Sequence, residues 1–283
     1  MDIQIRAKGN DFLYPFAKTA DVLRSADITL INLEAPLVSN CPPHREGFIF
    51  CAQSGFVDGL VHVGVDVVGL ENNHIGNYGA DGVSATKRVL RQRGIDYTDR
   101  STLAIRTVRG KRFGFLAFNG VGEYIDRQSM AAAIRKADSE VDVLVVSCHW
   151  GKEYVLLPQA DQWLAPDDPV AIAHLAIDAG ADLVIGNHPH WIQAVELYRN
   201  RLIAYAHGNF IFDQMFSPEV RQGVVGRYTF YDQHLVNVEY MPVLIENYSQ
   251  PRFLAGDEAQ AILNRMYQAS VALAASLQSG ARS

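Results

Sequence analysis

The first two thirds of the chain alternate between short apolar runs and segments whose apolar residues recur at helical spacing. The apolar runs predict strands at residues 27–33, 65–70, 141–148 and 182–185. The helical spacing predicts helices at residues 12–26, 79–93, 127–137 and 169–179. Two further runs, at residues 103–108 and 112–118, flank a turn and predict a hairpin. Alternation of this kind is typical of an α/β domain.

The pattern changes after Gly186, where apolar runs follow one another without a helical segment between them. These runs predict strands at residues 193–198, 202–206, 224–230 and 235–244, and an alanine-rich helix at residues 257–277. Residues 34–54 are rich in Pro, Asn and Cys and predict an irregular loop. Such an order predicts a mixed sheet or two sheets packed face to face. No linker or repeat interrupts it, so we expect a single domain over residues 1–283.

Composition places the chain among ordinary globular proteins, with 48% hydrophobic and 20% charged residues. The net charge of −6 argues against a protein that binds nucleic acid or a membrane through basic residues. There is no apolar stretch near the ~20 residues of a membrane span and no signal-peptide layout at the start. We therefore expect a cytoplasmic protein as the sequence stands. A membrane-anchored or extracellular location is expected instead if an N-terminal segment is missing.

The cysteines Cys41, Cys51 and Cys148 are odd in number and widely spaced, which does not suggest a disulfide framework and agrees with a cytoplasmic location. A Cys41–Cys51 bridge across the predicted loop stays open as an alternative.

Residues of metal-ligand type follow four of the predicted strands. They are Glu34 after residues 27–33, Asn73 and His74 after 65–70, His149 after 141–148, and His188 and His190 after 182–185. In α/β proteins, ligands gather beyond the carboxyl ends of the strands, so we expect these residues to converge on one crevice. Imidazole nitrogens, a carboxylate and an amide oxygen suit Zn, Mn or Fe. The sequence therefore predicts a site for a divalent metal ion.

The step from His188 to His190 adds detail to this prediction. If the backbone there is extended, both rings point to one face of the strand, and Pro189 stiffens the step. Two rings held in this way could each bind one of two ions ~3.5–4 Å apart. A single histidine at a strand end is usually solvated, and Asn72-Asn73 alone fits a turn with positive φ. The prediction therefore depends on the four clusters together.

Five segments resemble the signature blocks of the CapA family, which is associated with poly-γ-glutamate capsule synthesis. They are ADITLINLEAPL, GVDVVGLENNHIGNYGADGV, VDVLVVSCHWGKEY, AGADLVIGNHPHWIQAVELY and IAYAHGNFIFDQ. The blocks occur in the family's order and extend over residues 12–214, with the C-terminal strands and helix at residues 215–283 following them. The resemblance implies a four-layer α/β/β/α sandwich of the calcineurin-like metallophosphoesterase type, with one or two divalent ions.

The resemblance also implies a role for each candidate. Glu34 takes the place of the bridging acidic ligand. Asn73 takes that of an amide ligand, and His74 that of a proton donor or charge stabiliser. His149 matches the mid-chain ligand, and the pair at positions 188 and 190 matches one ligand for each metal. The family opens with a strand ending in Gly-Asp, and residues 1–10 are too short to supply it. We therefore expect this first strand to be missing or degenerate, with one ion bound firmly and at most a second bound loosely.

We expect a metal-dependent hydrolase in which activated water attacks a phosphoester or an amide-type carbonyl, while His74 protonates the leaving group. The expected substrate is an anionic small molecule or polyglutamate, and a capsule-synthesis complex is the partner that the resemblance implies. The candidate substrate contacts are Lys152, Glu153, Tyr154, His207 and Asn209. The alternative is a non-catalytic assembly or binding subunit of a polyglutamate-synthesising complex, with a vestigial metal site.

Overall fold

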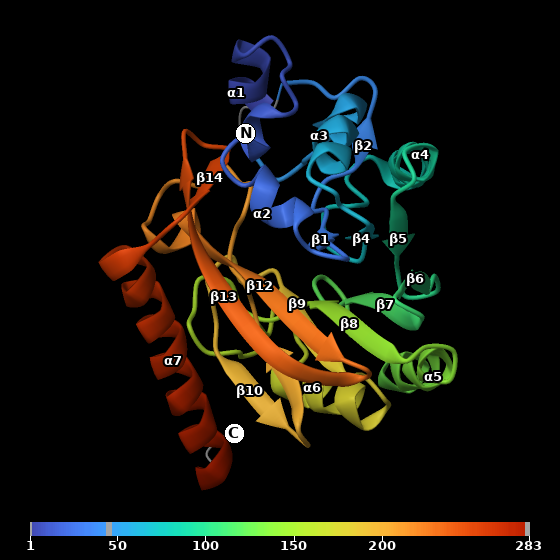
Figure 1. Cartoon of the computed structure of the whole chain (residues 1–283), viewed down its shortest axis with the longest axis vertical. Coiled ribbons are helices and arrows are strands. Elements are labelled where there is room, and N and C mark those ends of the chain that lie inside the picture. Colours follow the sequence, from blue (N-terminus) through green and yellow to red (C-terminus); the bar gives the residue numbers. More distant parts are fainter. Residues whose placement is uncertain (1, 44–46, 281–283) are drawn as a thin grey trace.

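The computed structural model describes residues 2–43 and 47–280 and stacks two sheet layers between two helical layers (Figure 1). The larger sheet has six strands in the order β10-β11-β9-β8-β7-β6. Their bounds are β6 (Ala104–Val108), β7 (Lys111–Asn119), β8 (Val143–His149), β9 (Leu183–Asn187), β10 (Val195–Tyr198) and β11 (Arg201–Ala204). The four inner strands are parallel, and the two edge strands pair antiparallel to them. Every residue of β8 is buried, which explains its continuous apolar run.

The second sheet layer faces this large sheet. It contains the parallel sheet β1-β4-β5 and the antiparallel sheet β12-β13-β14. Their bounds are β1 (Leu30–Asn32), β4 (Val67–Gly69), β5 (Asp96–Thr98), β12 (Gln222–Tyr231), β13 (His234–Glu246) and β14 (Gln250–Phe253). Between the layers, Val145 and Leu183 of the large sheet share one apolar cluster with Val67 of β4 and Phe230 of β12. The two sheets are therefore packed face to face.

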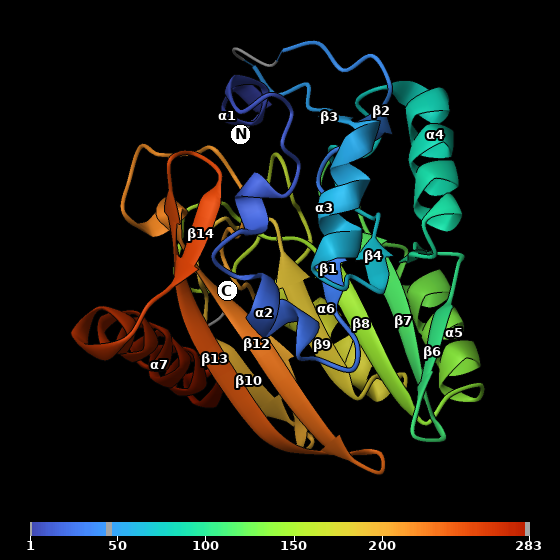
Figure 2. The ribbon, with the colours of Figure 1, turned by 45° about the horizontal axis from the view of Figure 1, so that its top comes forward.

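Helices cover the outer faces of the large sheet and of the β1-β4-β5 sheet (Figure 2). On the large sheet lie α5 (Arg127–Asp138) and α6 (Pro169–Asp178), with α7 (Gly256–Ser279) beside them. On the β1-β4-β5 sheet lie α2 (Ala20–Arg24), α3 (Val57–His62) and α4 (Gly79–Gln92). The Asp126 carboxylate caps α5 by accepting hydrogen bonds from two backbone N–H groups of its first turn. The order of layers confirms the predicted α/β/β/α sandwich.

The N-terminal region differs from the single helix predicted at residues 12–26. The structure has α1 (Asp2–Ala7), the 3₁₀ helix η1 (Tyr14–Phe16) and then α2. Pro15 explains the break, because proline lacks an N–H and is tolerated only in the first turn of a helix. Residues 2–29 contain no strand.

The predicted loop at residues 34–54 contains a short parallel pair, β2 (Leu37–Val38) and β3 (Ala52–Gln53), followed by the 3₁₀ helix η2 (Ser54–Phe56). Cys41 and Cys51 form a disulfide in this loop, with their Cα atoms 5.8 Å apart. The structure therefore adopts the Cys41–Cys51 bridge that the sequence left open. The cysteines consequently no longer argue for a cytoplasmic location. Among the described residues, no helix combines the length and apolar character needed to cross a membrane.

Candidate metal centre

The C-terminal end of β8 and the loops that follow β1, β4 and β9 bring the candidate ligands together. Ligand atoms of Glu34, His188 and His190 all lie within 4.8 Å of one another. His149 Nε2 lies 3.6 Å from Oε1 of Glu34 and 2.9 Å from Oδ1 of Asn73. The predicted convergence of these five residues is therefore present in the fold, and their binding of a metal stays a prediction.

Several atoms of this cluster are buried without a hydrogen-bond partner. Both ring nitrogens of His188 are in this state, and the side chain is only 1% exposed. Oε1 of Glu34 and Nδ1 of His149 are also buried and unpartnered. Each such group costs about 1–3 kcal/mol if nothing satisfies it. A divalent cation fits this set, since it would take up the lone pairs of the imidazoles and of the carboxylate.

The electrostatics of the site favour ligands that are ready to bind. Burial lowers the pKa of His149 well below its usual value and lowers the pKa of His188 to about 3, so both rings are neutral at pH 7. Neutral imidazole is the form that binds metal. Burial raises the pKa of Glu34 to about 8, while the hydrogen bond from Asn32 opposes this and the charge of Glu153 adds to it. The contact between His149 and Glu34 is therefore not an ion pair.

Asn72 positions the two N-terminal loops of the site, a role that the sequence did not reveal. Its Oδ1 accepts a hydrogen bond from the backbone N–H of His74 at 3.1 Å, and its amide donates to Oδ1 of Asn32 at 3.0 Å. Asn32 in turn donates to Oε2 of Glu34 at 3.0 Å. Neither Asn72 nor Asn73 has the positive φ of the alternative interpretation; the chain turns here with Asn72 Oδ1 accepting from the backbone N–H groups of His74 and Ile75. The paired asparagines were the signal that could have identified this role.

The backbone at the C-terminal pair of histidines is not extended. His188 has φ of 94° and His190 has φ of 59°, so both lie in the left-handed region that non-glycine residues rarely adopt. The expected extended step is therefore wrong, and a tight turn aims the rings. The backbone N–H of Tyr154 donates to the Pro189 carbonyl at 2.9 Å and supports this turn. Strain of this kind persists only where surrounding structure enforces it, and it is common at functional sites.

Asn209 orients the ring of His190. Its Oδ1 lies 2.9 Å from Nδ1 of His190, and its amide donates to the carbonyl of Val220 at 2.9 Å. When Nδ1–H of His190 donates to Asn209, the lone pair of Nε2 is left for a metal. This tautomer of His190 is assigned from its hydrogen bond with Asn209. The preceding Gly208 has φ of +72°, and a Cβ there would lie 2.6 Å from the carbonyl of Gln222. The oxygen and the nitrogen of the Asn209 side-chain amide thus both have protein partners. The predicted contact of Asn209 with substrate is therefore left without support.

His74 lies beside the ligand cluster. Its Nδ1 is 3.1 Å from Oδ1 of Asn77, and its Nε2 is 3.1 Å from the amide nitrogen of Asn73. These contacts fit a neutral ring that donates from Nδ1 and accepts at Nε2. Burial lowers the pKa of His74, and the hydrogen bond to Asn77 opposes this effect. This position agrees with a group that acts next to the metal ligands.

Two of the predicted substrate contacts lie against the pair of histidines. Oε1 of Glu153 is 3.8 Å from Nε2 of both His188 and His190. The ring of Tyr154 stacks on His190, with centroids 5.7 Å apart and planes 18° apart. Residues 153 and 154 therefore form a wall of the site.

The other two predicted contacts have different surroundings. Lys152 is exposed, and its backbone N–H donates to the Gln159 carbonyl. His207 Nε2 lies 2.8 Å from the hydroxyl of Tyr228, and its ring faces Tyr240 as well. Burial lowers the pKa of His207 to about 4. His207 thus belongs to a tyrosine cluster of β12 and β13, and a role in substrate binding stays a prediction.

A cavity of about 550 Å³ borders the cluster at Asn73. Its polar lining includes Arg100, which pairs with Glu71 at 2.9 Å and with Glu123 at 2.6 Å. Arg100 follows β5, a strand of only three residues that the apolar pattern did not predict. The rule that polar residues follow strand ends would have identified Arg100 if β5 had been recognised.

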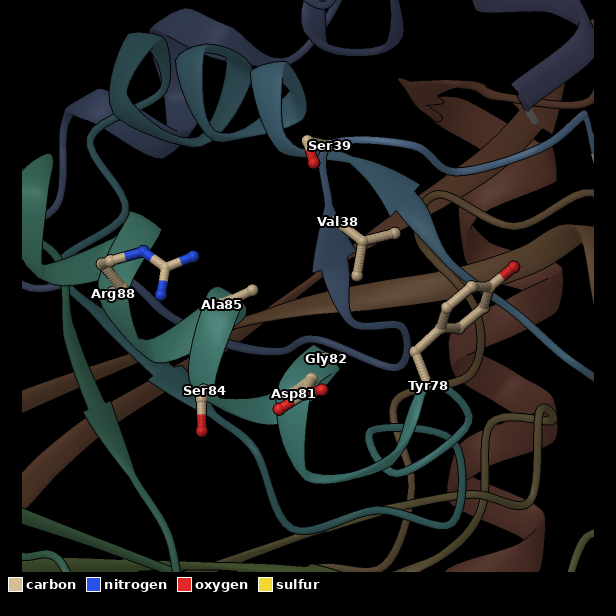
Figure 3. A pocket seen from close by; sticks show the side chains of 8 residues that line it. All are labelled: Val38, Ser39, Tyr78, Asp81, Gly82, Ser84, Ala85 and Arg88. Carbon is tan, nitrogen blue, oxygen red and sulfur yellow. The ribbon is translucent and has the colours of Figure 1, made fainter.

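A second, separate pocket of about 410 Å³ lies between β2 and the first turns of α4 (Figure 3). Val38, Tyr78 and Arg88 are among its lining residues, and none of the candidate metal ligands takes part. This pocket is therefore distinct from the metal centre.

Comparison with known proteins places these features in a family. The family model of the bacterial capsule synthesis protein PGA_cap matches residues 1–214. The capsule biosynthesis protein CapA of Bacillus anthracis is 25% identical over 261 residues, which cover 82% of this chain and 62% of that protein. The PGA biosynthesis protein CapA of Bacillus subtilis (strain 168) is 26% identical over 230 residues, which cover 73% of this chain and 58% of that protein. The chain thus spans about three fifths of these relatives.

Among solved structures, a hypothetical protein from Thermus thermophilus matches with a TM-score of 0.47 and 16% identity, covering 89% of this chain and 91% of that one. A likeness of this size carries no functional argument. The family model, by contrast, covers every residue of the candidate metal centre. The chain therefore belongs to the CapA family of bacterial capsule synthesis proteins.

Proposed function

We propose that this chain is a metal-dependent hydrolase that acts on an anionic substrate in the synthesis or processing of poly-γ-glutamate. The observation that carries the proposal is the group formed by Glu34, His188 and His190, whose ligand atoms lie within 4.8 Å of one another. The buried and unpartnered ring of His188 supports it further. The link to the polymer comes from family membership and from the names of the two Bacillus relatives.

A divalent ion such as Zn, Mn or Fe supplies Lewis-acid polarisation and water activation when it is bound. Asn73 and His149, together with the three residues of that group, would hold one or two such ions. His74 stands beside Asn73 and is the proposed proton donor to the leaving group; for this role its Nε2, which accepts from the Asn73 amide in this structure, must first take up a proton.

The surroundings of the cluster favour an anionic substrate. A local metal charge overrides the modest net charge of −6. Lys152 offers an exposed cation after β8, whereas Arg100 in the adjoining cavity is already paired with Glu71 and Glu123. The stacked ring of Tyr154 would limit the orientations of the substrate at this wall.

Activity and metal content together test this proposal. The protein is stripped with a chelator, reloaded with Mn²⁺ or Zn²⁺, and assayed on bis(p-nitrophenyl) phosphate and on a γ-linked glutamate oligomer. We expect turnover of at least one substrate only in the reloaded protein, and a loss of both bound metal and turnover in His188→Ala. His62→Ala, a histidine on α3 away from the cluster, serves as the matched control. Metal-loaded protein that hydrolyses neither substrate would contradict the proposed activity.

The second candidate is a binding or assembly subunit of a polyglutamate-synthesising complex. The names of both Bacillus relatives refer to biosynthesis, and the chain spans only about three fifths of their length. This candidate predicts a metal bound without turnover of either substrate, together with measurable binding of polyglutamate. The same assay therefore separates the two functions.

A further inference from the structure

The carboxylate of Glu153 lies between the rings of His188 and His190. Its Oε1 is 3.8 Å from Nε2 of each ring. Nε2 of His190 is available to a metal because Asn209 is the partner of its Nδ1. Nε2 of His188 is available because neither nitrogen of that ring has a hydrogen-bond partner. The position of Glu153 therefore indicates a role at these two nitrogens in addition to the predicted contact with substrate.

Distances identify what such a carboxylate can do. Bonds from zinc to protein nitrogen or oxygen are ~2.0–2.2 Å long, so two atoms bound to one ion lie at most ~4.4 Å apart. The 3.8 Å between Oε1 of Glu153 and Nε2 of His190 is within this limit. Glu34 and His190 have ligand atoms within 4.8 Å of each other, close to the same limit. Glu153 and His190 are therefore close enough to share one ion, and Glu34 lies beside His190.

Charge leads to the same conclusion. Glu34 and Glu153 face one crevice lined by neutral imidazoles. Across residues 2–43 and 47–280, the close basic neighbours of these two carboxyl groups are neutral histidines, and no Lys or Arg side chain joins them. Ionising both carboxyl groups in this partly buried site is costly without a cation. A bound metal ion supplies that cation.

The loop after β8 holds Glu153 in place. Gly151 has φ of +78°, which turns the chain immediately after the strand. The backbone N–H of Lys152 donates to the Gln159 carbonyl at 2.9 Å, and that of Tyr154 donates to the Pro189 carbonyl at 2.9 Å. These bonds on either side of Glu153 fasten the loop to the turn that carries the histidine pair. The carboxylate is therefore part of a built site.

We propose that Glu153 is a metal ligand, and that it forms a second ion site together with Glu34 and His190. The other ion keeps Asn73, His149 and His188, and shares Glu34. Among the residues assigned through the resemblance to the CapA family, the second ion has only two ligands, whereas stable catalytic sites usually supply three. Glu153 raises this number to three. This inference rests on the metal centre of the proposed function and assigns a residue to it that the resemblance leaves out.

The test compares metal binding by the full chain and its Glu153→Gln variant, which keeps the size of the side chain and removes its charge. Chelator-stripped protein is titrated with Mn²⁺ by calorimetry, and metal content is measured after dialysis. We expect two ions per chain in the wild type and one in Glu153→Gln, with the second affinity lowered by more than ~100-fold. Loss of a mere supporting hydrogen bond typically costs 10–100-fold. Electron paramagnetic resonance should show coupled Mn²⁺ pairs only in the wild type.

Glu140→Gln is the matched control, because Glu140 is an exposed carboxylate between α5 and β8. It should bind two ions with unchanged affinity. Two ions retained in Glu153→Gln, or one ion in both proteins with equal affinity, would overturn the assignment and leave the proposed hydrolase standing. Two ions in the wild type with no turnover would instead overturn the proposed function and leave the ligand assignment intact. A wild type that binds no ion would overturn both.

Discussion

The ring of Phe50 packs on the ring of His74, with their centroids 4.3 Å apart. The backbone N–H of Phe50 also donates to Oδ1 of Asn77 at 2.7 Å, and the same oxygen lies 3.1 Å from Nδ1 of His74. Phe50 directly precedes Cys51, which is bonded to Cys41. The disulfide loop therefore supports the proposed proton donor.

We predict that Cys51→Ser lowers the free energy of unfolding by about 2–4 kcal/mol, the usual effect of removing a native disulfide. The turnover number should also fall, because His74 loses part of the support that fixes its ring. Denaturant unfolding under oxidising conditions and steady-state kinetics measure the two effects. Reducing agent should lower the free energy of unfolding of the wild type by the same amount and leave that of Cys51→Ser unchanged. Equal stability of oxidised and reduced wild type would show that the bridge has no such role.

We predict that His74→Ala lowers kcat by ~10²–10⁴-fold, the range expected for the loss of a general acid. Bound metal should be nearly unchanged, since His74 lies beside the group of Glu34, His188 and His190. Metal analysis of the same preparation used for kinetics provides the check. Metal lost together with activity would identify His74 as a ligand and remove it as the proton donor.

We predict that Asn209→Ala weakens metal binding by ~10–100-fold, because His190 loses the partner that fixes its ring and its tautomer. Calorimetric titration of the stripped protein measures this change. Asn264→Ala, an exposed asparagine on α7, is the matched control and should bind metal like the wild type. If both variants bind alike, the hydrogen bond to His190 does not orient a ligand.

We predict a pH dependence of stability from His207, whose pKa is lowered by burial from 6.5 to about 4. Between about pH 6.5 and about pH 4, His207 binds a proton in the unfolded chain but stays unprotonated in the folded chain. His207 therefore contributes stability above about pH 6.5, and this contribution is lost as the pH falls toward about 4. One proton corresponds to at most ~1.4 kcal/mol per pH unit. Unfolding of wild type and His207→Gln at several pH values should give a flatter profile for the variant, and parallel profiles would contradict the assignment.

The layered fold and most of the candidate site can be predicted from the amino-acid sequence alone. Long apolar runs such as residues 141–148 indicate buried strands because burial on both faces leaves no room for polar residues. Each such run stops abruptly at a polar residue, such as His149 at the end of β8. Both features are local, so they can be read along the chain. The blocks that resemble the CapA family then supplied the order of the layers.

How the ligands meet depends on the three-dimensional packing of the chain. The positive φ of His188 and His190, the contact of Asn209 with His190 and the approach of Glu153 all depend on segments far apart in sequence. β5 has the sequence Asp-Tyr-Thr and lies in no apolar run, unlike the equally short β1 and β4, and its pairing with β4 places it in the sheet. The disulfide likewise requires two Cα atoms to come within bonding range, which spacing alone does not establish. Contacts between distant residues are set by packing of the whole chain, and no local pattern encodes them.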